Sequence, residues 1–551
     1  MRPEVLVPIV LLASVLGYPL FLLVAIALNA GDPEDIPPLE FGFNNLLLLG
    51  DHTHLLWNTL AVAGAGTVLA TVMATILAWI LHRTNLPRRS LFEALILIPY
   101  PVGPLVGALA WNILGAPRTG MVNQAFSALT GMQGPLIDTW SPAGIVFVMA
   151  IFDTPAAVLI IGAAMQRMDP SLEECSAVLG ARPLGTAFRI TLPLMLPAIA
   201  SAAVFLFVSM ISEFSIPAIL GAGSRFYVVT TAIYNAFQGY PPNYPLAAVL
   251  GIVLILFTVG TVWLSSRLLG RRTHAVVGGR AWRPRRIDLG GWTWVAIAVV
   301  LLYLAVAVAL PMLALVMASL QGSAEISWSP SAWSLSNYTY ILFDFPTTRR
   351  AILNSLMLGV GTGTIGVACA VFVAVAVHRS RGPGRGLLEQ MAMLPQAFPR
   401  LVFAVGLMWM FLMLPIPLYG SLAGVLFAYV IVFLPLAFRS MSGVVVQLDA
   451  ALEEAARVSG AGWRRTMRTI TIPLLRSGIV ATWILLFMVS VREVSASLFL
   501  AGPRNPVLGP SILNFWESGG LPHVSTLAVV QAAIILAALF LARRFARDPV
   551  L

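Results

Sequence analysis

The sequence contains no lysine, since all 33 of its basic residues are arginine. A phosphate-binding Walker A loop requires a lysine, so the chain cannot itself be a P-loop ATPase. Cysteine and histidine are also scarce, with two Cys and six scattered His. These numbers exclude a disulfide scaffold and any Cys/His cluster with recognisable metal-ligand spacing.

Charged residues are the second shortage. They make up 10% of the 551 residues, whereas 59% are hydrophobic; a typical soluble domain is about a quarter charged. Apolar runs of about 20 residues, long enough to cross a bilayer as a helix, recur along the whole chain. The sequence therefore predicts an all-α integral membrane protein. The first run, 5–28, is too long for a signal-peptide core, and we expect it to be the first span.

We expect about twelve transmembrane helices, six in each half of the chain. The first six are predicted at 5–29, 55–81, 91–115, 142–165, 195–217 and 245–269. The second six are predicted at 292–319, 351–377, 388–413, 420–438, 477–499 and 525–542.

The net charge of +10 is unevenly distributed over the links between these spans. The links and span ends on one side carry 26 Arg, and the links on the other side carry five. Because cytoplasmic loops of membrane proteins are enriched in basic residues, this asymmetry places both termini in the cytoplasm. The basic balance is therefore a topology signal and does not indicate a nucleic-acid partner.

The two halves repeat each other. Glu213-Phe-Ser215 corresponds to Glu493-Val-Ser495, and Pro155 to Pro435, at the same offset of 280 residues. An even number of spans in each unit gives both units the same orientation, which defines a parallel duplication. We therefore expect a first six-span unit at 1–269, an Arg-rich cytoplasmic linker at 270–290 and a second unit at 291–551.

Two polar segments, 169–193 and 449–473, occupy the same position in the two units, on the side assigned to the cytoplasm. In the second segment, Asp449 is placed to cap a short helix rich in Ala, Leu and Glu. Gly460 should end that helix, and Pro473 should mark the return of the chain to the membrane. Each segment therefore predicts two short helices joined at a glycine.

These segments resemble the EAA loops of ABC importer permeases. In the second segment the motif is Glu454-Ala455-Ala456, Gly460, Ile470, Ile472 and Pro473, preceded by Glu453. In the first it is Glu174-Cys175-Ser176, Gly180, Ile190, Leu192 and Pro193, preceded by Glu173. The first copy lacks both alanines, and the second departs only at Ile472. An ordinary amphipathic loop is not expected twice in the same register.

One polypeptide with two such units resembles the fused permeases of the ferric iron importer group, which have the type I fold. The segments "PLVGALAW" and "VREVSASLFLAG" add to this similarity. The resemblance implies a transport subunit of the bacterial inner membrane that is not an enzyme. Iron(III) is the first expectation for its solute. Thiamine and aminoalkylphosphonate importers share the fused layout and polyamine permeases share the loop, so these solutes stay open.

The resemblance also implies two protein partners. Two identical ATPase subunits, which use ATP and Mg²⁺, would dock on the two EAA loops. A periplasmic or lipid-anchored binding protein would deliver the solute to the opposite face. The chain itself would bind no cofactor. An ion-coupled secondary transporter is the alternative from another class, although it would have no use for a duplicated docking loop.

Ionisable residues within spans are candidates for the translocation pathway, because a charge in lipid is costly. The four candidates are Glu213, Glu493, Arg400 and Asp153. Packing at the membrane interface stays open for the two glutamates, and pairing with a carboxylate stays open for Arg400.

The third span of each unit contains several prolines, in "LIPYPVGP" and "MLPQAFP". We expect these prolines to break both spans near the middle. Broken helices that line a cavity expose backbone groups to the solute of a transporter. A packed kink without solute contact is the alternative.

Overall fold

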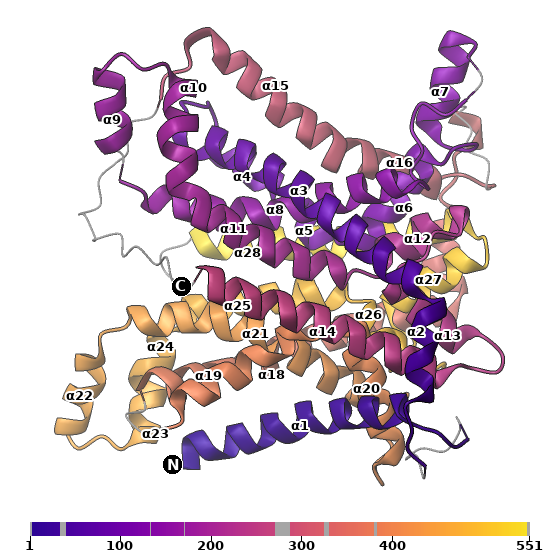
Figure 1. Cartoon of the computed structure of the whole chain (residues 1–551). Coiled ribbons are helices and arrows are strands. Elements are labelled where there is room, and N and C mark those ends of the chain that lie inside the picture. The colour runs from indigo at the N-terminus through magenta and orange to yellow at the C-terminus, as the bar shows by residue number, and fades with distance from the viewer. Residues whose placement is uncertain are drawn as a thin grey trace. The chain divides into compact units, whose positions relative to one another are not determined.

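The computed structural model describes residues 3–32, 40–132, 134–169, 171–269, 287–323, 330–379 and 383–547 (Figure 1). Within these ranges the chain forms helices and isolated β-bridges but no strand. The predicted all-α fold is thereby confirmed. Most of the predicted linker, 270–286, lies outside the described residues.

Ten helical segments of the described chain are long and apolar enough to cross a membrane, and each coincides with a predicted span. They are α1 (Pro3–Ala27), α3 (Thr53–Arg83), α8 (Pro142–Arg167), α11 (Leu192–Ile211), α14 (Tyr244–Leu269), α15 with α16 (Thr293–Leu304 and Leu310–Ser319), α18 (Pro346–Arg379), α21 (Leu422–Gln447), α25 (Arg476–Val491) and α28 (Leu521–Arg547).

The third span of each sequence repeat is broken, as predicted. The helices over Arg89–Val102 meet α6 (Pro104–Gly115) at 96°, and those over Arg385–Ala397 meet α20 (Arg400–Met413) at 103°. In the first break, Gly103 has φ +99°, a conformation that disfavours residues with a Cβ atom. With these two bent pairs, the described helices account for all twelve predicted spans.

The fifth span of each repeat ends earlier than predicted. The helices end at Ile211 and Val491, whereas the predicted spans run to 217 and 499. Ser212-Glu213 and Arg492-Glu493 directly follow the two ends, but apolar residues resume beyond them, so the predicted spans extend past the breaks. Short helices follow each end. They are α12 (Ser215–Ser224) and α13 (Val229–Gln238), bent by 77°, and α26 (Ser495–Leu498) and α27 (Leu508–Glu517).

The chain forms two compact units, and neither is a contiguous half of the sequence. One comprises residues 1–49, 233–255 and 334–551, and the other comprises 50–232 and 256–333. In the first unit α1 packs on α19 (Arg385–Met393) and α20. In the second, α16 packs on α6, and α15 packs on α4 (Arg89–Ile96). The opening helix of each repeat therefore packs among helices of the other repeat.

Close contacts hold the exchanged helices in place. A Cβ atom added to Gly406 of α20 would lie 2.8 Å from the carbonyl oxygen of Pro19 on α1, so only glycine allows this approach. In the other unit, the Tyr303 hydroxyl on α15 donates to the carbonyl oxygen of Ile151 on α8 at 3.1 Å. Each exchanged helix is thus integrated into the unit that receives it.

The described end of the linker lies against the end of α3. The backbone N–H of Ile287 donates to the carbonyl oxygen of Arg83 at 2.8 Å, and its carbonyl accepts from Asn85 at 3.1 Å. The side-chain amide of Asn85 also donates to Asp288 Oδ1 at 2.6 Å. This short bridge leads the chain from the linker into α15.

Candidate functional site

Each polar segment begins with a capped short helix at the end of its unit far from α12 or α26 (Figure 1). These helices are α9 (Ser171–Val178) and α22 (Ala450–Val458). The carboxylates of Asp169 and Asp449 accept hydrogen bonds from the backbone N–H groups of Ser171 and Ala451, both at 2.9 Å. First-turn N–H groups have no partner within a helix, so these carboxylates satisfy them. The predicted cap is confirmed in both copies.

A glycine ends each short helix, as predicted. Gly180 has φ +81° and Gly460 has φ +80°. This left-handed conformation is the usual helix stop, and glycine adopts it without the strain that a Cβ atom brings.

The second half of each segment differs from the prediction of a separate short helix. α10 (Pro183–Thr186) and α23 (Trp463–Thr466) continue through π-helical turns, Ala187–Thr191 and Met467–Thr471, into the fifth span. Pro193 and Pro473 follow these turns directly, in the first turn of the next helix. A proline cannot donate to the carbonyl four residues back and its ring collides with it, and the wider π turn relieves both conflicts. The segment therefore connects rigidly to the span.

In the unit that contains the first segment, Glu173 forms a buried ion pair. Its Oε2 lies 3.3 Å from Nη1 of Arg83, and the two side chains are 6% and 2% exposed. The Thr191 hydroxyl donates to Glu173 Oε1 at 2.5 Å. Arg83 Nη2 also donates to the carbonyl oxygens of Met165 and Met168, at 2.8 and 3.3 Å.

The second segment repeats this arrangement in the other unit. Glu453 Oε1 lies 3.3 Å from Nε of Arg379 and accepts from the Thr471 hydroxyl at 3.2 Å. Arg379 Nη2 donates to the carbonyl oxygens of Val445 and Leu448, at 3.2 and 2.8 Å. We call each Arg–Glu–Thr set a latch.

Each latch joins four elements. The arginine comes from the end of the second span, and it binds the last carbonyls of the fourth span and the glutamate of the short helix. The threonine lies in the π turn that leads into the fifth span. Breaking a buried ion pair costs about 3–5 kcal/mol, because an uncompensated charge stays buried. Each polar segment is therefore fixed to three spans at once.

Sequence reasoning named Glu173 and Glu453 but missed the other latch residues. Arg83 and Arg379 had a detectable signal, because each ends a His-Arg pair at the same position of the two repeats. The threonines, Thr191 and Thr471, lie inside the motif between its isoleucine and its proline.

The remaining motif residues differ in burial, and Ser176 and Ala456 are buried. Glu174, Ile190 and Ile470 are half-buried, and Glu454 is exposed. Large apolar side chains around the glycines are exposed as well, with Val178 at 88%. We call these residues the loop patches. They are Leu172, Val178, Leu179 and Phe188 in the first segment, and Leu452, Val458 and Trp463 in the second.

The intramembrane candidates divide into two groups. Arg400, the first residue of α20, places Nη1 2.8 Å from Oε2 of Glu493, which is 3% exposed. Glu493 Oε1 also accepts from the N–H of Ala496 at 3.1 Å, at the start of α26. The sequence left open a pathway role for Arg400 or pairing with a carboxylate, and the structure shows the pairing. The pair joins the two breaks in the helices of its unit.

The first repeat has no equivalent of this ion pair, because Pro104 stands where the second repeat has Arg400. Glu213 Oε1 accepts from the N–H of Ser215 at 2.8 Å and so caps α12. Asp153 is half-buried on α8. Its counterpart in the second repeat is Phe433, whose ring centre lies 5.4 Å from the Arg400 guanidinium.

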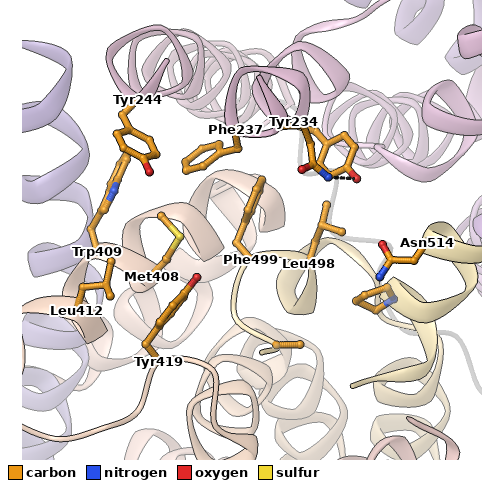
Figure 2. Close-up of a pocket in the computed structure, with 13 residues that line it drawn as sticks. Tyr234, Phe237, Tyr244, Met408, Trp409, Leu412, Tyr419, Leu498, Phe499 and Asn514 are labelled. Atoms are coloured by element: carbon orange, nitrogen blue, oxygen red, sulfur yellow. Dashed lines mark hydrogen bonds between the residues drawn. The ribbon is translucent and has the colours of Figure 1, made fainter. Parts of the chain in front are cut away.

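A cavity of about 700 Å³ opens in the unit that contains α22, at the opposite end of α25 (Figure 2). We call it the aromatic chamber. It is lined by Tyr234, Phe237, Gln238, Tyr244, Met408, Trp409, Leu412, Tyr419, Leu498, Phe499, Ala501, Pro510 and Asn514.

Helices of this length and composition, two capped polar loops and paired intramembrane charges define a polytopic transport subunit. Residues 5–274 and 364–548 match the family of binding-protein-dependent transport system inner membrane components. The chain therefore belongs to this family and is an ABC importer permease.

Its relatives include iron permeases. The chain is 27% identical over 491 residues to the ferric transport system permease protein FbpB of Actinobacillus pleuropneumoniae, covering 87% of this chain and 70% of that protein. It is 26% identical over 453 residues to a putative ferric transport system permease protein, FbpB 1, of Haemophilus influenzae, covering 80% and 69%.

Shorter matches extend beyond iron. A spermidine/putrescine transport system permease protein, PotC, of H. influenzae is 27% identical over 240 residues, or 43% of this chain and 91% of that protein. Among solved structures, a bacterial ABC transporter involved in the import of the acidic polysaccharide alginate aligns with TM-score 0.41 and 20% identity, over 49% of this chain and 94% of that one.

Proposed function

We propose that this permease imports iron(III) across the inner membrane, with both termini in the cytoplasm. Two relatives that cover most of the chain are named as ferric transport permeases, which supports iron as the solute. The proposal includes an ATPase dimer, which uses ATP and Mg²⁺, on the cytoplasmic face and a solute-binding protein on the other face.

The observation that carries the coupling part of the proposal is the pair of latches. The exposed loop patches supply apolar surface for the ATPase subunits, since exposed apolar clusters are typical of protein–protein interfaces. Glu174, Glu454, Gly180 and Gly460 then shape the docking helices. When an ATPase subunit moves its loop, the buried latch moves the ends of the second, fourth and fifth spans with it.

Glu213, Glu493, Arg400 and Asp153 stay proposed residues of the translocation pathway. Half of the Arg400 side chain is exposed, at 48%, although its partner Glu493 is almost fully buried. The arginine side chain is therefore accessible beside a helix break, where a solute and the broken backbone would meet.

Thiamine, aminoalkylphosphonate and polyamines are the alternative solutes, and the partial match to a spermidine/putrescine permease favours polyamines among them. The alternative from another class is ion-coupled transport without an ATPase. The duplicated latch argues against it, because fixing a loop to three spans couples the spans to a protein that binds and moves the loop, and ion-coupled transport needs no such protein.

Uptake by the reconstituted system tests the proposal. The chain is reconstituted in proteoliposomes with its partner ATPase and binding protein, and radioactive iron(III) bound to the binding protein is supplied outside. We expect uptake that requires ATP and stops when the Walker lysine of the ATPase is replaced. Iron uptake driven by an ion gradient without ATPase would overturn the coupling. ATP-dependent uptake of spermidine or thiamine, without iron uptake, would overturn iron as the solute.

A further inference from the structure

His82 lies directly before the latch arginine Arg83, near the end of α3, and is 7% exposed. The latch itself does not use this side chain. Arg89 Nη2 lies 2.5 Å from His82 Nδ1, and Gln166 Nε2 lies 3.1 Å from the same nitrogen. A guanidinium only donates hydrogen bonds, so Nδ1 is the acceptor and carries no proton. The ring of His82 thus receives a hydrogen bond from α4, where Arg89 is the first residue, and faces α8 through Gln166.

Close packing fixes this ring against the fourth span. A Cβ atom added to Gly162 of α8 would lie 2.4 Å from His82 Nε2, so the ring lies directly against the backbone of α8. In the second repeat Ser442 stands at the position of Gly162, and its hydroxyl is hydrogen-bonded to Nε2 of His378. In both repeats, therefore, the histidine before the latch arginine holds the end of the second span on the fourth span.

A short turn brings Arg89 back to the end of α3. Residues 84–88 connect α3 to α4, and Arg88 has φ +50°, a left-handed conformation that residues with a Cβ atom rarely adopt. Gly384 stands at the equivalent position of the second repeat and has φ +102°. Both repeats therefore reverse the chain at this point. In the first repeat the reversal lets the Arg89 side chain reach His82, seven residues earlier.

Arg89 begins the broken third span of the first repeat. The helices over Arg89–Val102 meet α6 at 96°, and α4 packs on the exchanged helix α15. Arg89 Nε also lies 3.9 Å from Oε2 of Glu93, one turn further along α4. The latch by itself contacts only the second, fourth and fifth spans. The bond between His82 and Arg89 therefore adds the third span to the set that the first loop reaches.

The second repeat holds its third span differently. Arg385 and Glu389 of α19 stand at the positions of Arg89 and Glu93. Within the part of the chain that the structure describes, however, no hydrogen bond joins Arg385 to His378, whose Nε2 is bonded to Ser442. The second repeat is thus an internal comparison in which the histidine is present and the link to the third span is absent.

We propose that His82 is a positioning residue that transmits movement of the first loop to the broken third span. This inference rests on the coupling in the proposed function, because it concerns where the movement of the latch goes. When α9 moves, Glu173 moves Arg83, and the adjacent His82 moves with it. The bond to Arg89 then moves the start of α4. Because α4 reaches α6 through the bend at Gly103, that bend absorbs the change in angle between the two helices.

Hydrogen exchange in the assembled importer tests this proposal. The full chain with its partner ATPase in lipid nanodiscs is measured without nucleotide and with ATP and vanadate. In the wild type we expect ATP to change exchange in both α9 and α4. In His82→Phe, which keeps a ring but has no acceptor, the change in α9 should persist and the change in α4 should fall roughly fivefold. His82→Asn places an oxygen near the position of Nδ1 and should restore the response of α4.

Three further variants separate the link from general effects on the fold. Arg89→Leu should reproduce His82→Phe, and the double variant should be no worse than either single variant, because both changes remove one bond. Arg88→Asn removes the neighbouring exposed arginine and supplies a residue that tolerates the left-handed conformation, so it should respond as wild type. His378→Phe should leave the response of α19 unchanged, since His378 has no bond to Arg385 within the described chain.

The outcomes distinguish failure of this inference from failure of the proposed function. A wild-type response of α4 in His82→Phe or Arg89→Leu would overturn the link, as would additive losses in the double variant or no recovery in His82→Asn. Loss of the α9 response in His82→Phe would show that His82 only supports the fold of the latch. If ATP changed exchange in neither α9 nor α4 of the wild type, the proposed coupling itself would fail, and this inference would fall with it.

Discussion

The carboxylate of Glu173 and the guanidinium of Arg83 lie 3.3 Å apart and are both buried. Glu173 belongs to the loop helix α9 and Arg83 to the end of the membrane span α3. Glu453 and Arg379 repeat the pair in the other unit at the same distance. In the proposed importer the loop transmits force from an ATPase subunit to the spans, and a buried ion pair with several further hydrogen bonds is a stiff attachment for that purpose.

Arg83→Ala should uncouple the first loop. The change leaves Glu173 buried without its charge partner, a loss of about 3–5 kcal/mol for a pair of this kind. We expect faster hydrogen exchange in α9 and at least a tenfold loss of iron uptake. The double variant Arg83→Leu with Glu173→Leu should restore slow exchange, because an apolar pair replaces the charges without an unpaired remainder. Equal exchange in the single and double variants would contradict the latch.

Arg379→Ala should be milder than Arg83→Ala. The second pair is more accessible, with side chains 16% and 11% exposed against 2% and 6%, so water compensates more of the stranded charge. The measurement is hydrogen exchange in α22 and α9, compared between the two variants. A larger effect in α22 would show that burial does not rank the two latches.

Gly460→Ala should impair docking of the ATPase, whereas Gly462→Ala should not. Gly460 has φ +80°, and a Cβ atom in that conformation costs roughly 1–2 kcal/mol. Gly462 has φ −68° and open space around it, so alanine fits there. Co-purification of the ATPase with each variant is the readout.

Gly460→Pro and Glu454→Lys should abolish uptake while the spans stay inserted, and normal uptake in both would count against docking at this loop.

The loop patches should mediate the contact with the ATPase. Val178→Ser combined with Val458→Ser removes two of the most exposed apolar side chains of the loops, at 88% and 90%. We expect a severalfold weaker association in a pull-down experiment with purified ATPase. Leu129→Ser, on α7 (Met121–Thr130), removes an equally exposed side chain outside the loops and should leave association unchanged. If both changes weaken the association equally, the weaker association reflects nonspecific hydrophobic contact and not a specific contact of the loop patches.

Arg400→Gln should impair uptake and spare ATPase docking. The change leaves the buried carboxylate of Glu493 without its charge partner. Because Glu493 also caps α26, the link between the two helix breaks of that unit is lost. Adding Glu493→Gln removes the stranded charge and should recover the yield of folded protein. It should not recover uptake if Arg400 contacts the solute. Full recovery of uptake in the double variant would show that Arg400 has only a structural role.

Glu213→Gln combined with Glu493→Gln, compared with wild type, tests the glutamates in the same assay.

The sequence by itself determined the membrane-spanning character, the duplication, the capped loops and the broken third spans. These features depend on local properties, such as apolar run length, proline and glycine positions and residues that recur at a fixed offset. Local chemistry specifies them because the bilayer and the backbone act on each segment separately.

Only the tertiary structure decided how these segments meet. The packing of α1 and α15 on helices of the other sequence repeat, the early end of the fifth spans and the aromatic chamber depend on side chains far apart in the chain. Arg83 and Glu173 each look like an ordinary charged residue of a cytoplasmic segment. They become a latch because packing removes both from water, and a buried charge in apolar surroundings requires a partner.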